Sequence, residues 1–185
     1  MRKFITTHIK VIFSTEFIFV LFLFSGRYKA LLGFIPIDIT LLLMIITFAL
    51  LITKHLKTLV IQKYVLYLTL LFAILSTYVF ASSVYSYSEV QAHEKTFRFI
   101  FVTGWAFIGT LLIIKNNESI YKFLTSITLI AFIMTISTIY NFMFFNTGSF
   151  ITGLGTNYLG TATTISLGIL IIYSAFLLKK ETKKV

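Results

Sequence analysis

A short stretch between Glu89 and Arg98 holds the densest group of ionisable side chains in this sequence. Glu89, His93, Glu94, Lys95 and Arg98 fall within ten positions, with long apolar runs on both sides. Glu89 and His93 are four residues apart, and so are Glu94 and Arg98. If the stretch is helical, each pair lies on one helix face, where its members can interact. Three kinds of chemistry follow from this set: metal binding, general acid–base catalysis and anion binding.

Metal binding and catalysis have little support in these residue types. A metal site needs two or more histidine or carboxylate ligands at fixed spacing, and this stretch has one histidine and no His-Glu-x-x-His pattern. His93 and a glutamate could form an acid–base pair, but no nucleophile is identified beside them. We therefore assign no catalytic residue, no metal site and no cofactor.

Anion binding is the chemistry that the basic residues favour. Lys95 and Arg98 could hold a phosphate or diphosphate at a membrane–water boundary, because guanidinium geometry matches such groups. The alternative is a solvated stretch whose cations extend to lipid headgroups.

The composition places these residues in a membrane protein. Of the 185 residues, 58% are hydrophobic and 12% charged, and the mean hydropathy is +0.95, whereas soluble domains carry about a quarter charged residues. The net charge of +10 does not indicate nucleic-acid binding, because the basic residues lie singly or in small groups at the ends of apolar runs. The lack of cysteine excludes disulfides, thiolate ligands and cysteine nucleophiles.

The apolar runs predict an all-α fold, a polytopic transmembrane bundle of about six helices that forms a single domain over residues 1–185. The predicted helices span residues 11–25, 38–53, 64–84, 97–114, 120–145 and 159–178. The first could be a signal peptide, since a basic lead precedes it. No Ala-x-Ala-like site follows it, however, so we interpret it as a retained helix.

Two acidic residues lie within or beside these apolar runs. Glu16 is costly at bilayer depth and should face protein, water or an interface. Asp38 precedes the second run, where it can cap the exposed amides of the first turn and suits the positive end of the helix dipole. We therefore predict that Asp38 is a helix cap, and the alternative is a buried functional carboxylate.

The distribution of basic residues predicts the orientation. With six helices, 12 of the 16 Lys and Arg residues lie on one face of the membrane, and only Arg27, Lys29, Lys95 and Arg98 lie on the other. The positive-inside rule then places both termini in the cytoplasm and the chain in the cytoplasmic membrane as a multi-pass protein. The stretch 89–98 and the loop 146–158 should face outward.

Small and hydroxylated residues recur at spacings of three and four in the last three predicted helices. Such stripes let helix backbones approach closely in lipid. No ionisable side chain lies among them, so we predict helix packing rather than a substrate or ion path. The stripes are Thr103, Ala106 and Thr110; Thr128, Ala131, Thr135 and Thr138, continued by Asn141; and Gly160, Thr164 and Gly168.

A glycine-rich loop over residues 152–160 leads into the last helix. Glycines let backbone amides approach a ligand, and a helix start favours anions. The loop has no Gly-x-Gly-x-x-Gly or Walker pattern and no preceding strand, so it is first of all a turn. We include Asn157 from this loop with Lys95 and Arg98 as candidate contacts of a diphosphate.

The order of several soft motifs resembles a known family. The chain is similar to the N-terminal half of the bacterial O-antigen ligase and O-antigen polymerase-like family, which includes capsular polysaccharide polymerases. The motifs are Pro36-Ile37-Asp38-Ile39-Thr40, the Tyr-Ser end of the third helix, Glu94-Lys95-Thr96-Phe97-Arg98-Phe99, Ile113-Ile114-Lys115-Asn116-Asn117-Glu118 and Gly155-Thr156-Asn157-Tyr158-Leu159-Gly160. The resemblance implies metal-independent transfer of glycans carried on polyprenyl diphosphate, at the outer face of the membrane.

One departure from the family limits this expectation. The family's main active-site arginine and histidine residues lie on a large outward loop in its second half, which has no counterpart here. We therefore expect a fragment of a larger protein, not catalytic alone, whose partners are membrane lipids, the polyprenyl-diphosphate-linked glycan and a second polypeptide. The alternatives are a small transporter or channel subunit, with Glu16 and Asp38 as its candidate charges, or a non-catalytic membrane scaffold.

Overall fold

The computed structural model describes residues 11–12, 14–28, 38–55, 63–145 and 158–181. These residues form helices joined by turns, and none of them is in a strand. The helices are α2 (Thr15–Leu23), α3 (Ser25–Tyr28), α4 (Ile39–His55), α5 (Lys63–Val84), α6 (Glu89–Arg98), the π-helix η2 (Phe99–Thr103), α7 (Gly104–Ile113), α8 (Asn117–Phe145) and α9 (Tyr158–Glu181).

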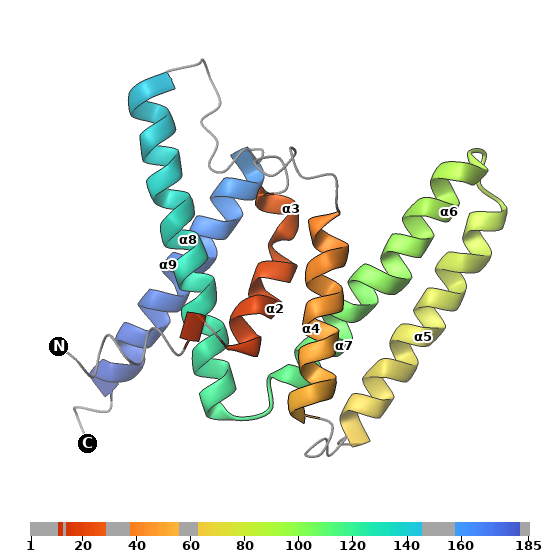
Figure 1. The fold of residues 1–185 in the computed structure, drawn as a ribbon, viewed down its shortest axis with the longest axis horizontal. Helices are drawn as coiled ribbons and strands as arrows, with labels where there is room; N and C mark the ends of the chain where they lie inside the picture. Colours follow the sequence, from red (N-terminus) through yellow and green to blue (C-terminus); the bar gives the residue numbers. More distant parts are fainter. Residues whose placement is uncertain (1–10, 13, 29–37, 56–62, 146–157, 182–185) are drawn as a thin grey trace.

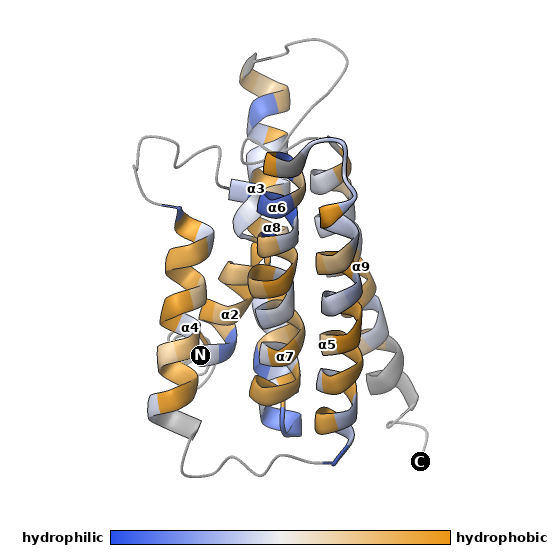
Figure 2. Cartoon of the chain, turned by 90° about the vertical axis from the view of Figure 1, so that its right-hand side faces the viewer, coloured by the Kyte–Doolittle hydropathy of each residue, from blue (hydrophilic) through white to orange (hydrophobic). Residues whose placement is uncertain are grey.

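Four helical stretches are long and apolar enough to cross a membrane. They are Lys63–Val84, Val90–Ile113, Asn117–Phe144 and Leu159–Phe176, and Ile39–Thr53 is a shorter apolar helix. Orange, apolar residues cover most of α4, α5 and α7, and a blue, hydrophilic stretch lies in α6 (Figure 2). The length and composition of these helices indicate a membrane protein.

Helix α3 continues in the direction of α2, and α6, η2 and α7 follow one another in a single direction. The other successive helices run in opposite directions (Figure 1). As a result, the α5–α6 turn, the start of α4 and the start of α9 lie at one end of the bundle. The starts of α5 and α8 lie at the other end. We call the first of these the upper end, as it is drawn.

The first predicted helix, 11–25, is wrong as a single continuous element. Ser14 has an extended backbone and its side-chain oxygen accepts a hydrogen bond from the Phe17 amide at 3.1 Å, so α2 begins after it. A serine that satisfies a first-turn amide in this way starts a new helix. A turn at Phe24 then separates α2 from α3.

The predicted start of the fourth helix at residue 97 is also wrong. The charged stretch from Glu89 is itself helical and continues through η2 into α7 without a break. The Ser88 carbonyl accepts a hydrogen bond from the Ala92 amide at 2.9 Å, which opens the helix. Inside the stretch, an ion pair four residues apart, Glu94 with Arg98, adds support.

Helix α2 lies at the centre of the bundle, between α4 and α8 (Figure 1). Its Phe19 and Phe22 are buried with Leu51 of α4 and Ile113 of α7. On another face of α2, Val20 packs with Ile127 and Ile130 of α8. Glu16 in the first turn of α2 is only 7% exposed, so of the three surroundings predicted for it, protein, water or an interface, it faces protein.

Close helix packing occurs where two of the three predicted stripes lie. Thr164 of α9 is fully buried, and a Cβ added at Gly168 would lie 2.5 Å from the Ala131 Cβ of α8. The stripe on the fourth helix is confirmed only in part, because Thr103 is exposed whereas Ala106 packs against the core. There, Gly104 and Gly109 provide the close approaches instead, to Phe72 of α5 and Phe19 of α2.

Candidate functional site

A pocket of about 830 Å³ lies between the upper part of α4 and the wall formed by α6 and η2. Its α4 side is lined by Asp38, Thr40 and Leu41, with Gly26 of α3 beside them. Its other side consists of His93, Glu94, Lys95, Phe97, Arg98, Phe99, Phe101, Val102 and Thr103. The volume lies in the range typical of sites for small ligands.

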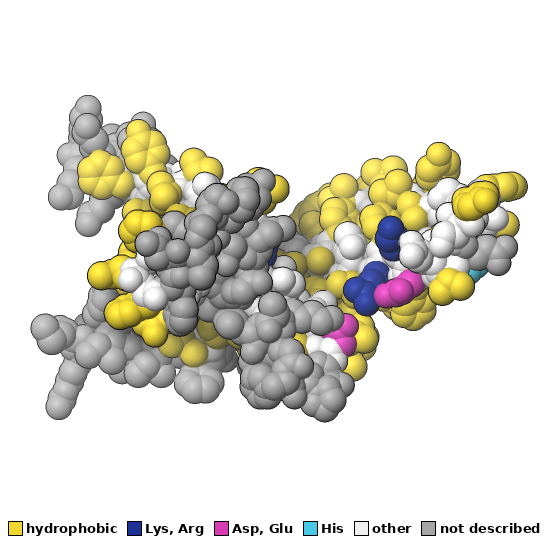
Figure 3. All heavy atoms as spheres, turned by 90° about the horizontal axis from the view of Figure 1, so that it is seen from above, with side chains coloured by type: hydrophobic (Ala, Val, Ile, Leu, Met, Phe, Trp, Pro, Cys, Tyr) yellow, Lys and Arg dark blue, Asp and Glu magenta, His cyan; other side chains and the backbone are white. Residues whose placement is uncertain are grey.

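Both basic residues singled out in the sequence, Lys95 and Arg98, line this pocket. Arg98 pairs with Glu94, whose Oε1 lies 2.9 Å from the arginine Nη2, and both side chains are nearly two-thirds exposed. Seen from above, basic and acidic side chains lie close together on the part formed by α5 and α6, among apolar ones (Figure 3). Asn157, the third predicted contact, lies outside the described residues.

The α4 wall of the pocket is held by its helix cap. Asp38 Oδ1 accepts a hydrogen bond from the Thr40 amide at 2.9 Å, and the Asp38 carbonyl accepts one from the Leu42 amide at 2.9 Å. The predicted capping role of Asp38 is therefore confirmed. The Thr40 hydroxyl in turn lies 2.9 Å from the Ser25 hydroxyl, so the start of α4 is tied to α3.

The π-helix η2 sets the direction of the opposite wall. Phe72 of α5 stacks on Phe99 at a centroid distance of 5.5 Å and on Phe107 at 5.6 Å, and it also covers Gly104. Phe99 and Gly104 are five residues apart, a spacing that an α-helix would place on different faces. The wider turn of the π-helix brings both against α5, and it leaves Thr103 exposed in the pocket.

The lower part of the pocket is apolar. Leu41 lies one turn below Asp38 on α4, and Phe101 and Val102 lie below Arg98 on the other wall. The Phe97 and Phe101 rings are in contact, with centroids 4.2 Å apart. The pocket therefore has charged groups near the upper end of the bundle and apolar groups toward its middle. This arrangement matches an amphiphilic ligand, with a charged head and an apolar chain.

Below the pocket, α4 and α7 are joined by a polar contact. The indole Nε1 of Trp105 donates a hydrogen bond to the Thr47 Oγ1 at 2.9 Å, and Thr47 is fully buried. Phe48 of α4 also meets the Trp105 ring edge to face. This contact joins α4, which forms one pocket wall, to α7, which continues from the other wall. Nothing in the sequence pattern pointed to it, because the partners are 58 residues apart.

Unlike Glu94 and Arg98, which pair with each other within α6, His93 contacts a neighbouring helix. Its Nδ1 lies 3.5 Å from the Ser83 hydroxyl of α5, which points to a contact across the α5–α6 hairpin. The side chain of Glu89, its expected partner four residues earlier, lies outside the described part of the chain. Within the described ranges, no three His, Asp or Glu side chains come together as a metal site would need.

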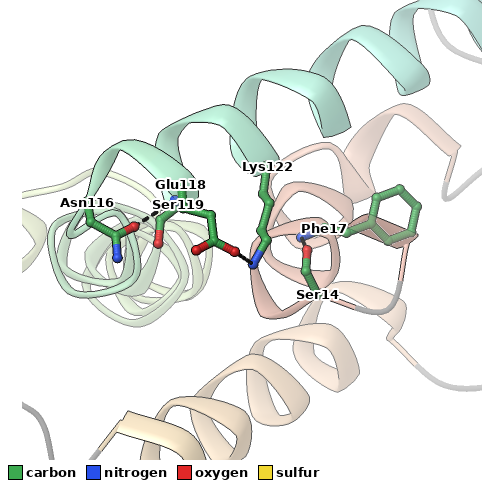
Figure 4. A network of polar contacts seen from close by, with 6 residues as sticks. All are labelled: Ser14, Phe17, Asn116, Glu118, Ser119 and Lys122. Carbon is green, nitrogen blue, oxygen red and sulfur yellow. Dashed lines mark hydrogen bonds and ion pairs between the residues drawn. The ribbon is translucent and has the colours of Figure 1, made fainter. Parts of the chain in front are cut away.

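A second polar cluster lies at the start of α8, at the lower end of the bundle (Figure 4). Asn116 Oδ1 accepts a hydrogen bond from the Ser119 amide at 2.8 Å, and Lys122 pairs with Glu118 at 2.6 Å. The Lys122 side chain extends toward the start of α2, where Ser14 caps the helix (Figure 4). These contacts fix two helix starts, so we interpret this cluster as structural.

Comparisons with known proteins give no match, whether with a protein-family model, a curated protein or a solved structure.

Proposed function

We propose that this protein binds a polyprenyl-diphosphate-linked glycan in the pocket between α4 and α6, as a component of bacterial surface polysaccharide synthesis. The observation that supports this function most is the placement of Lys95 and Arg98 on one wall, above the apolar side chains of the same pocket. The motif order that resembles O-antigen ligases and polymerases points to the same class of ligand.

The chemistry of the pocket suits such a ligand. A diphosphate presents several anionic oxygens, which a guanidinium binds in pairs and an ammonium binds as a point charge. The isoprenoid chain next to it is apolar and would pack against Leu41, Phe101 and Val102. The volume of about 830 Å³ accommodates a headgroup with the first part of the chain, and the rest would extend into the bilayer.

The pocket walls also suit a ligand that comes from the membrane. One wall belongs to α6 and η2, which form part of the candidate span Val90–Ile113, and the other belongs to the apolar helix α4. The positive-inside rule predicts that this end of the bundle faces outward from the cytoplasmic membrane. The ligand would then be bound in the outer leaflet, where lipid-linked glycans are polymerised or transferred in the resembled family.

The role proposed for this chain is binding rather than catalysis. In the resembled family, glycosyl transfer needs further arginine and histidine groups on a large outward loop. A second polypeptide that supplies such groups would complete a metal-independent glycosyltransferase.

A binding measurement with matched charge variants tests the proposal. The protein in lipid nanodiscs is titrated with fluorescent farnesyl diphosphate, as wild type, as K95A/R98A and as K63A/K115A. The last variant removes two exposed lysines, at the start of α5 and just before α8. We expect K95A/R98A to weaken binding by about tenfold or more, because two charge-assisted contacts are lost. Equal affinity of all three proteins would contradict the proposal.

A further inference from the structure

We infer that His93 is a third contact of the diphosphate and that it binds the anion only when its imidazole is protonated. This inference rests on the proposed function, because it concerns the same pocket. It makes the affinity for the lipid diphosphate rise as the pH falls.

The position of His93 makes such a contact possible. It lines the pocket on the same wall as Lys95 and Arg98, and its side chain is exposed. Helix α6 runs down from the upper end of the bundle, so His93 lies above Arg98, by roughly 7.5 Å along the helix axis. A lipid diphosphate whose apolar chain lies below Arg98 would extend its outer phosphate toward His93.

The hydrogen bonds of Ser83 on α5 determine which ring nitrogen of His93 carries a proton. The Ser83 hydroxyl donates its only hydrogen to the Phe80 carbonyl, at 2.7 Å. Toward His93 Nδ1, which lies 3.5 Å away, the same hydroxyl can only accept. Nδ1 is therefore the nitrogen that carries the proton, and in the neutral ring Nε2 has a lone pair.

Protonation changes only the Nε2 side of the ring. Nδ1 donates to Ser83 in both charge states, so the contact between α5 and α6 is kept. Nε2 changes from an acceptor, which a phosphate oxygen cannot pair with, into a donor on a positively charged ring. Among the described residues, Ser83 is the only hydrogen-bond partner of His93, so Nε2 can bind a ligand.

The charges around His93 give a third cation a clear effect. Two cations and two carboxylates line the pocket, and one of the carboxylates, Glu94, pairs with Arg98. A further positive charge strengthens the attraction for a ligand that carries two or more negative charges. The ionisable side chains described around His93 are Glu94, Lys95 and Arg98 on α6, Asp38 across the pocket on α4, and Tyr78, Tyr85 and Tyr87 on α5 and in the turn after it.

The substitution H93N tests the inference and keeps the contact with Ser83, because the asparagine amide can donate from near the place of Nδ1. Asparagine has no counterpart of Nε2 and gains no charge. Wild type, H93N and H55N in nanodiscs are titrated with fluorescent farnesyl diphosphate at several values between pH 5 and 8. The phosphate groups of the probe also titrate in this range, so the quantity compared is the ratio of wild-type to variant affinity at each pH.

We expect the wild type to bind about three- to tenfold more tightly than H93N at pH 5, because histidine gains its charge between pH 8 and 5 and then makes a charge-assisted contact. At pH 8 the two proteins should bind equally, which also shows that H93N is folded. H55N changes a histidine at the lower end of α4 and should match the wild type throughout.

The outcomes separate this inference from the proposed function. If the ratio of wild-type to H93N affinity is the same from pH 5 to 8, the role of His93 is wrong, and the pocket stands as long as K95A/R98A weakens binding. If K95A/R98A has no effect at any pH, the pocket itself is wrong.

Proton uptake gives an independent measurement. Calorimetric titrations with farnesyl diphosphate are run in two buffers of different ionisation enthalpy, at the pH where the wild-type and H93N affinities diverge. We expect the wild type to take up more protons on binding than H93N does, because the ligand favours the protonated ring. Equal uptake by the two proteins would overturn the inference.

Discussion

Arg98 and Glu94 form an ion pair on the pocket wall, with the arginine Nη2 2.9 Å from the glutamate Oε1. Both side chains are nearly two-thirds exposed, so this pair contributes little to stability. It has a direct consequence for binding, because a phosphate that reaches Arg98 must compete with the Glu94 carboxylate.

Removing this competitor should strengthen binding. We expect E94Q to tighten the binding of farnesyl diphosphate by about two- to fivefold, which corresponds to the usual range for an exposed ion pair. In an R98A background the same substitution should have no more than a small effect, because the guanidinium for which Glu94 and the phosphate compete is gone. The four proteins of this double-mutant cycle are compared by titration in nanodiscs. Weaker binding by E94Q would mean that Glu94 positions Arg98 for the ligand instead.

The cap of α4 gives a prediction for stability. We expect D38A to lower the stability by about 0.5–2 kcal/mol, because the Thr40 amide loses its acceptor. D38S and D38N should stay near the wild type, since both side chains can cap the helix. Thermal unfolding in detergent, followed by circular dichroism, compares the three. An equal loss in all of them would show that the charge of Asp38, rather than the cap, stabilises the fold.

The contact between α2 and α7 gives a test of the packing. A Cβ at Gly109 would lie 2.7 Å from a ring carbon of Phe19, which is fully buried. We expect G109A to cost about 1–3 kcal/mol of stability through overpacking. Gly26 has no atom within 4 Å of an added Cβ, so G26A is the control and should change stability by less than about 0.5 kcal/mol. A well-tolerated G109A would mean that these two helices are farther apart.

The transporter alternative has two candidate charges, Glu16 and Asp38. Asp38 caps α4, so the test falls on Glu16. The carboxylate side chain is buried in the first turn of α2 and does not line the α4–α6 pocket. We expect E16Q to leave proton and cation flux through proteoliposomes at the level of the wild-type protein. A wild-type flux above that of protein-free liposomes, lost in E16Q, would favour a transporter or channel subunit.

Several features of the fold and the site follow directly from local sequence patterns. Asp38 could be predicted as a cap because a short polar side chain precedes a long apolar run. The pairing of Glu94 with Arg98 follows from their spacing once the stretch is helical. The charged stretch from Glu89 to Arg98 stands out because charges are rare in so apolar a chain.

Other features depend on contacts between distant parts of the chain. The Trp105 to Thr47 hydrogen bond joins helices that no local pattern pairs. The π-helix arises because Phe99 and Gly104 both pack on Phe72, a demand that comes from α5 rather than from residues 99–103. The break at Ser14 was missed because the residues 11–13 before it and 17–24 after Glu16 are apolar, which made the whole run resemble one helix. The helix cap itself was the available signal.

The most direct test of the diphosphate pocket is to locate a bound lipid diphosphate. A farnesyl diphosphate analogue with a photoreactive diazirine next to the diphosphate is crosslinked to the protein in nanodiscs, and the labelled peptides are identified by mass spectrometry. The account predicts labelling within 38–41 and 93–103, which unlabelled farnesyl diphosphate suppresses and K95A/R98A abolishes. Labelling spread over the exposed faces of α5, α8 and α9, unaffected by competitor, would contradict it.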